Sequence, residues 1–181
     1  MDFSKRILIS GLVHIRKIDN GVETWSKVVH NKINNNLKIA IGHIICNSSS
    51  INRNYCYINQ MRIYGVTNQS DLTNITPPSP VDDFPNRHYI LKEAPASMNT
   101  FSNVVPGVNL FSATVQNDDK LNGENVYYIS DIVLSGINGA TGEQEVWSRL
   151  LAPSDSSGPI GLLKTPSVSY RIDWYIIFEQ E

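Results

Sequence analysis

Residues that could do chemistry are few in this chain of 181 residues, and they lie far apart in the sequence. Histidines and aspartates are the natural candidates for a metal site, but the histidines fall in different predicted elements without metal-site spacing. Two aspartate pairs lie in predicted loops, and neither pair fits the pattern of a calcium-binding loop. We therefore interpret these residues as packed or solvated side chains and predict no bound metal. They are His14, His30, His43, His88, Asp82-Asp83 and Asp118-Asp119.

Motifs for catalysis and cofactor binding are also missing. Residues 135–143, SGINGATGE, are rich in glycine and follow a predicted strand, but they do not open the helix that a dinucleotide site needs. Neither a G-x-S-x-G elbow nor a His-Glu-x-x-His pair occurs. Paired catalytic carboxylates need no proximity in the sequence, yet nothing points to them. We predict that the chain is not an enzyme and that it uses no cofactor.

Aromatic residues are the one suggestive class of side chain. The three tryptophans, Trp25, Trp147 and Trp174, are predicted to lie in the core. Six other aromatic residues flank a proline-rich stretch, where they either pack a loop down or serve as exposed contacts for proteins or sugars. Both interpretations stay open. These residues are Tyr55, Tyr57, Tyr64, Phe84, Tyr89 and Phe101.

Composition excludes several classes of partner. The chain is 41% apolar and 18% charged, with 15 basic and 17 acidic residues, so it has no basic patch for nucleic acid. No apolar run is long enough to cross a membrane, and the N-terminus lacks the apolar region of a signal peptide. We expect a protein that is made in a cytoplasm and stays soluble until it meets its partners. Cys46 and Cys56 fit a disulfide or two buried free thiols, and the second interpretation is favoured.

The clearest structural signal is the C-terminal stretch, residues 167–181, which alternates with a period of two and predicts a strand inside a sheet. One face should meet a core. The opposite face begins with Arg171 and Asp173 and ends with Tyr175 and Ile177, so its second half is also expected to be covered. The core-facing residues are Tyr170, Ile172, Trp174, Ile176 and Phe178.

The N-terminal part predicts a hairpin followed by a helix. Residues 6–18 alternate with their isoleucines toward the core, and Gly11 predicts a bulge or a close backbone approach. Asp19-Asn20-Gly21 predicts the tight turn, and residues 23–30 predict the return strand. In residues 31–47 the apolar spacing changes to three and four, which predicts a helix of about four turns with Asn31 as its N-cap.

The rest of the chain reads as strands separated by turns. Strands are predicted over 55–64 (ending at Gly65), 88–94, 126–134, 146–151 and 160–164, with two more in 99–116 split by Pro106-Gly107. Residues 66–87 form a Pro-rich irregular loop, and residues 154–158 a short one. Strands joined by turns indicate an all-β, antiparallel fold. We predict a single domain over 1–181, a β-sandwich of about 8–10 strands with one α-helix inserted after the first hairpin.

The order of these segments resembles a family of tailed-bacteriophage virion proteins. The resemblance covers residues 6–178 and rests on a strand leading into a helix at 28–45, a strand ending in glycine at 59–68, and the polar loop with Asp71-Leu72-Thr73. It continues with the strand YYISDIVLSG at 127–136 and the segments 146–153 and 158–178. Lys164 before a loop and Ile172-Asp173-Trp174 match the end of the family pattern, whereas residues 74–87 are richer in proline than that pattern.

The resemblance implies a small, non-enzymatic virion component, of the tail-fibre, adaptor, baseplate or head-decoration type. Such a protein is made in the host cytoplasm, assembles with itself, most often as a trimer, and docks on other virion proteins. Candidate interface residues come from the N-terminal tail and the Pro-rich loop. The alternative is a carbohydrate-binding or receptor-binding β-sandwich module that contacts a host surface glycan, and an enzyme that degrades polysaccharides ranks third. The candidate interface residues are Asp2, Phe3, Pro78, Phe84, His88 and Tyr89.

Overall fold

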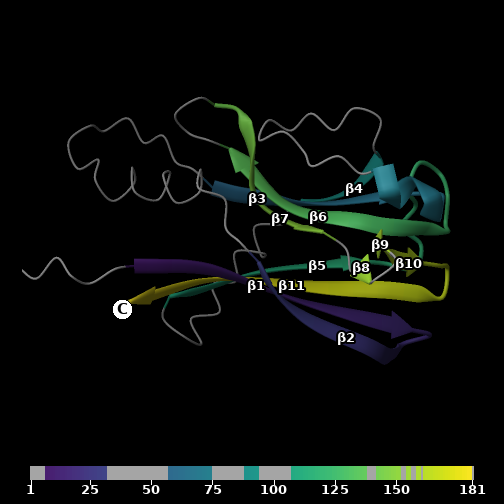
Figure 1. Cartoon of the computed structure of the whole chain (residues 1–181), viewed down its shortest axis with the longest axis horizontal. Helices are drawn as coiled ribbons and strands as arrows, with labels where there is room; N and C mark the ends of the chain where they lie inside the picture. The colour runs from purple at the N-terminus through teal and green to yellow at the C-terminus, as the bar shows by residue number, and fades with distance from the viewer. Residues whose placement is uncertain are drawn as a thin grey trace, which may run out of the picture.

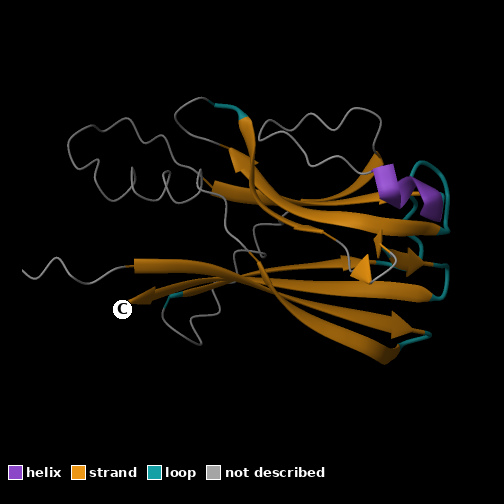
Figure 2. Ribbon diagram, in the orientation of Figure 1, coloured by secondary structure: helices purple, strands orange, loops and turns teal. Residues whose placement is uncertain are grey.

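The computed structural model describes residues 7–31, 57–74, 88–93, 107–137, 142–151, 154–155, 158–159 and 161–180. These residues form two antiparallel sheets stacked face to face, with one short 3-10 helix beside them (Figures 1 and 2). The prediction of an all-β sandwich is confirmed.

The first sheet, called sheet A, contains both ends of the described chain. Its strand order is β2-β1-β11-β5, so the C-terminal strand lies between the N-terminal strand and a strand from the middle of the sequence (Figure 1). All three pairings are antiparallel. The strands are β1 (Ile7–Asp19), β2 (Val22–Asn31), β5 (Val108–Val115) and β11 (Val168–Gln180).

The second sheet, called sheet B, is built around β6. This strand pairs β3 along one edge, and β3 in turn pairs β4, while β10 and β7 pair successive parts of β6. A two-residue pair, β8 and β9, and the 3-10 helix η1 complete the described elements. Their bounds are β3 (Tyr57–Val66), η1 (Gln69–Asn74), β4 (His88–Glu93), β6 (Tyr127–Ile137), β7 (Gln144–Leu151), β8 (Ser154–Asp155), β9 (Gly158–Pro159) and β10 (Leu162–Lys164).

The core lies between the facing surfaces of the two sheets. Val13 pairs with Trp174 in sheet A, and Ile63 pairs with Ile132 in sheet B, and all four side chains are buried. Trp147 of β7 is also fully buried in this cluster. The alternation of β1 and β11 therefore places their apolar faces as predicted, and two of the three tryptophans are core residues.

The hairpin between β1 and β2 closes with the turn predicted from the sequence. Asn20 and Gly21 both have positive φ, 48° and 83°. Consecutive positive φ values belong to the tight turn whose twist matches that of antiparallel strands, and asparagine and glycine adopt them at low cost.

Several finer predictions are wrong. For Gly11 the bulge is wrong, because the ladder is regular there and the bulge lies between Lys17 and Ile18, where Thr24 of β2 is the extra residue. The alternative for Gly11, a close backbone approach, stays a prediction. Trp25 is 37% exposed, because it lies on β2, which is at the edge of sheet A. Glycine does not end β3, because a bulge there lets Gly65 pair with Ile129 and Val66 with Tyr128.

Two segments predicted to be irregular contain short hydrogen-bonded structure. Ser154, Asp155 and Gly158 of the predicted loop take part in the small pair β8–β9, in which Ser154 lies opposite Pro159. The first part of the Pro-rich loop forms η1. Such short elements have too few residues to show a periodic pattern, so the sequence does not distinguish them from a loop.

Some predictions fall on other parts of the chain. Apart from Asn31, the helix over 31–47 lies outside the described residues, as do Cys46, Cys56, the strand before Pro106 and residues 75–87. Asn31 is the last residue of β2, and its side-chain amide donates to Ser148 Oγ at 2.7 Å, joining the two sheets.

Candidate functional site on the outer face of sheet A

The outer face of sheet A, turned away from sheet B, carries its polar side chains in cross-strand rows. Strand register places Arg16 opposite Arg171 in one row, and His14 opposite Asp173 in the next. β5 adds Thr114 beside Arg171 and Ser112 beside Asp173. Two arginines directly opposite each other would repel, so the carboxylate in the neighbouring row is the group that holds this part of the sheet together.

Asp173 is an outward-facing carboxylate that is nevertheless only 2% exposed. It forms an ion pair with Arg16, accepts a hydrogen bond from Ser112 Oγ at 2.5 Å, and lies 3.3 Å from Arg171 Nε. Burial by itself would raise the pKa of Asp173, but these hydrogen bonds and the charge of Arg171 outweigh it and lower the pKa below its usual value. The carboxylate is therefore ionised near neutral pH and acts as a structural clamp.

The other half of the outer face is apolar. Leu12, Tyr175 and Leu110 form one cross-strand row, and Ile177 and Val108 lie in the next. All five side chains are partly buried, and no described helix or strand packs over them (Figure 2). Leu8, farther along the same face of β1, is 42% exposed. The sequence predicts that the second half of this face is covered, but no described helix or strand covers it.

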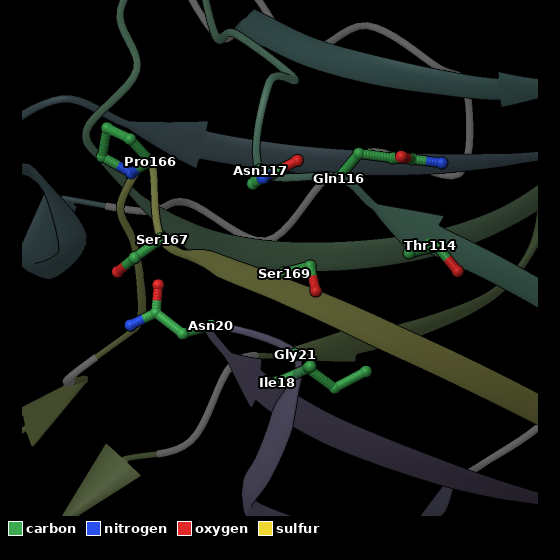
Figure 3. A pocket seen from close by; sticks show the side chains of 9 residues that line it. All are labelled: Ile18, Asn20, Gly21, Thr114, Gln116, Asn117, Pro166, Ser167 and Ser169. Atoms are coloured by element: carbon green, nitrogen blue, oxygen red, sulfur yellow. The ribbon is translucent and has the colours of Figure 1, made fainter.

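A pocket of about 350 Å³ opens where the strands of sheet A meet their turns. It is bounded by the β1–β2 turn, the turn before β11 and the end of β5. Figure 3 shows Asn117 and Gln116 on one side of the hollow and Asn20 on the other, with Ser167 and Ser169 between them. Thr114 and the apolar residues Ile18 and Pro166 complete most of the lining. None of the lining residues carries a charge.

Hydrogen bonds tie the three loops around the pocket to one another. The Asn20 backbone N–H donates to the Ser167 carbonyl oxygen at 3.0 Å, which joins the first turn to the turn before β11. Lys164 joins that turn to the end of β5, because its Nζ donates to the carbonyl oxygens of Thr165 and Asn117 at 2.9 and 3.0 Å. The pocket is therefore bounded by three segments that hydrogen bonds link to one another.

Lys164 is the least expected of these residues, because it is a fully buried cation. Its Nζ lies 5.7 Å from the centroid of the Tyr127 ring as well as near the two carbonyl oxygens. Burial lowers the pKa of Lys164 below its usual value, and the negative charges of Asp119 and Asp118 oppose that shift. The sequence places Lys164 before a turn, but only the tertiary structure shows that it bridges two loops.

The outer face of sheet B carries a second buried ion pair. Asp131 is fully buried, accepts from Arg149 Nε at 2.6 Å and from Ser130 Oγ at 2.9 Å, and lies in a strand beside the bulge of β6. Tyr64, Val133 and Val146 form a small buried apolar cluster on this face. Of the two interpretations of the aromatic residues, packing rather than exposed contact is therefore the correct one for Tyr64.

The residues singled out from the sequence do not come together. His14 and His30 lie in different rows of the outer face of sheet A. Asp118 is exposed, and Asp119 accepts a hydrogen bond from the Gln116 backbone N–H at 2.7 Å, so it shapes a turn. Within the described ranges no three potential metal ligands gather.

The candidate interface residues are mostly beyond the described structure. Asp2, Phe3, Pro78 and Phe84 lie outside the described residues. His88 and Tyr89 begin β4, an edge strand of sheet B, where their backbones pair with Gly65 and Tyr64. Their proposed role as interface residues stays a prediction.

Comparison with protein-family models, with curated proteins and with solved structures yields no match for this chain. In the part of the chain that the structure describes, no helix is long and apolar enough to span a membrane.

Proposed function

We propose that the chain is a non-enzymatic structural component of a tailed-bacteriophage virion. It assembles with copies of itself, with a trimer favoured by the family resemblance, and docks on other virion proteins. The proposal draws on the order of segments in the sequence and on the distribution of apolar side chains over the surface. The second of these is the observation that carries it.

Exposed large apolar side chains gather on the β1–β2 hairpin. Among the described residues six such side chains are substantially exposed, and four of them belong to this hairpin. Val22 is 64% exposed, Val28 54% and Leu8 42%, and Trp25 follows at 37%. Register places Leu8 and Val28 on the outer face of the hairpin and Trp25 and Val22 on the opposite face. Exposed apolar side chains on both faces of an edge strand favour a contact made along that edge.

The hairpin also offers an open sheet edge. Among the described strands β2 pairs only with β1, so no described strand occupies its second edge. The bulge at Thr24 interrupts this edge near the turn, and the ladder is regular from Trp25 to Asn31. An open edge with apolar side chains on both sides favours association with another chain. A role in assembly therefore agrees with both the side chains and the backbone of this strand.

Light scattering after size exclusion tests the proposal. The chain is expected to elute with three times the mass of one chain, and Val28→Lys is expected to shift the equilibrium toward monomer by about tenfold or more, because it puts a charge into an apolar contact. Leu163→Lys is the matched control. Leu163 is 41% exposed on β10 of the other sheet, so this variant should keep the wild-type mass.

Two results would count against the proposal. One is a chain that stays monomeric and does not co-sediment with purified tailed particles. The other is an oligomer that Val28→Lys and Leu163→Lys weaken equally, because the contact would then not involve the hairpin.

A further inference from the structure

The pocket at the turn end of sheet A is lined by neutral hydrogen-bonding side chains. They come from three separate segments, and they are Asn20, Thr114, Gln116, Asn117, Ser167 and Ser169. Amides and hydroxyls each supply both donors and acceptors. A lining of this kind complements a ligand that also carries donors and acceptors side by side, which is the property of a sugar hydroxyl.

Most of this hydrogen-bonding capacity is not used by the protein. Within the described ranges, the side chains of Thr114, Gln116 and Ser169 make no hydrogen bond to another residue. The Asn20 amide donates from Nδ2 to Asp19 at 3.1 Å, which leaves its carbonyl oxygen as an acceptor. The Ser167 hydroxyl has only a 3.2 Å contact with the Thr165 hydroxyl. Groups of these kinds are available to a ligand.

The lining also argues against other classes of ligand. A charged ligand normally meets a side chain of opposite charge, and none lines this pocket. An apolar ligand would leave the six polar side chains without partners, which is unfavourable. The larger share of the lining surface is nevertheless apolar, from Ile18, Pro166 and the carbon atoms of the polar side chains, and it suits the C–H face of a sugar ring. The volume of about 350 Å³ lies at the lower end of the range for ligand pockets, as expected for one or two sugar units.

The pocket is held in shape before any ligand arrives. The Asn20–Ser167 backbone hydrogen bond and the two bonds of Lys164 fix the three loops relative to one another. A preformed pocket does not spend binding free energy on ordering its own loops. We propose that this pocket binds a neutral saccharide unit of a glycan. The proposal does not rest on the assembly function.

An NMR titration of the full chain tests this inference. Methyl α-D-mannopyranoside, methyl β-D-galactopyranoside and N-acetylglucosamine are the neutral probes, glucuronate is the charged probe, and glycerol is the additive control. At least one neutral sugar is expected to shift the amide signals of residues 18–21, 114–117 and 167–169 in a saturable manner. Glucuronate and glycerol are expected to cause no saturable shift there.

Substitutions locate the site. Thr114→Val removes one lining hydroxyl at nearly constant volume and is expected to weaken binding about 3- to 10-fold, as for the loss of one neutral hydrogen bond. Ser169→Ala is the second variant, in case Thr114→Val does not fold. Ser26→Val removes a hydroxyl from the same sheet outside the pocket lining and should leave the affinity unchanged.

The inference is overturned if none of the three neutral sugars shifts these signals at about 50 mM, which corresponds to negligible affinity. It is also overturned if glycerol reproduces the shifts, or if Ser26→Val weakens binding as much as the pocket variants do. Each readout is an amide shift, so it stays distinct from the particle mass that tests the assembly function.

Discussion

At the scale of single residues, Asp173 points to the outer face of its sheet, yet its side chain is buried by the groups that bind it. Its partner Arg16 is 157 positions away in the sequence, and only the β1–β11 register brings the two together. The sequence indicates that Arg171 and Asp173 share a face, because they are two residues apart in a strand. The sequence contains no signal that Arg16 of the N-terminal strand also binds Asp173.

We expect Asp173→Asn to destabilise the fold by about 2–4 kcal/mol, because it leaves two arginines facing each other without their buried counter-ion. Urea unfolding at pH 7 measures the change. Asp71→Asn, at an exposed position, is the control and should cost less than about 0.5 kcal/mol. Equal effects of the two substitutions would contradict a special role for Asp173.

The Asp173 carboxylate should make the free energy of unfolding depend on pH in the acid range. The pKa of Asp173 is lowered in the folded state, so its contribution is complete above the pKa of the unfolded chain, about 4, and is lost as the pH falls through the folded value. The difference in unfolding free energy between wild type and Asp173→Asn should therefore be constant near neutral pH and shrink below about pH 4. A difference that persists unchanged in acid would argue against the ionised form as its source.

Tyr170 gives the corresponding prediction in alkali. Burial, with a smaller effect from the charge of Asp19, raises the pKa of Tyr170 to about 12, and its hydroxyl donates to the Leu163 carbonyl oxygen at 2.8 Å. A raised pKa stabilises the fold below the ordinary value of about 10 and loses this contribution as the pH rises toward the folded value. Tyr170→Phe should therefore remove part of the loss of stability between pH 10 and 12, measured by urea unfolding. An unchanged pH dependence in the variant would contradict the assignment.

At the scale of elements, a glycine at the bulge of β3 decides how closely β3 approaches β6. Gly65 of β3 lies so near to β6 that an added Cβ would be 2.8 Å from the Tyr128 carbonyl oxygen and 3.0 Å from Leu121 Cδ2. The sequence pattern treats this glycine as the end of a strand. The structure continues the strand through it, because only glycine fits against the backbone of β6 at this bulge.

Gly65→Ala should destabilise the fold by about 2–3 kcal/mol, since the clashing atom belongs to the backbone and cannot turn aside. Gly123→Ala is the matched control, because nothing lies within 4 Å of an added Cβ there and only its φ of +86° opposes alanine. That strain amounts to about 1–2 kcal/mol. Thermal unfolding of both variants compares them, and a smaller effect for Gly65→Ala would show that β3 and β6 can separate.

At the scale of the whole molecule, β11 is the strand on which sheet A depends. It pairs with β1 over thirteen residues of register and with β5 on its other edge, and it contributes Trp174 to the core. The sequence alone predicted a strand inside a sheet here, because a long apolar alternation at a chain end needs partners on both sides.

A chain that ends at Lys164 is therefore expected not to fold, because β1 and β5 lose their shared partner and the core loses one wall. Circular dichroism and the dispersion of amide NMR signals measure this. A chain that ends at Phe178 keeps the pairing of Ile9 with Phe178 and should remain folded. A cooperative unfolding transition in the shorter chain would contradict the central role of β11.

The sequence by itself determined the strand class, the first hairpin and the core-facing sides of β1 and β11. These features depend on local periodicity and turn chemistry, which act over a few residues. Only the tertiary structure decided that Arg16 meets Asp173, that Lys164 bridges two loops, and that Asn20, Thr114 and Ser169 line one pocket. Those contacts depend on strand order and register, which are set by how two sheets bury a common core and not by any local pattern.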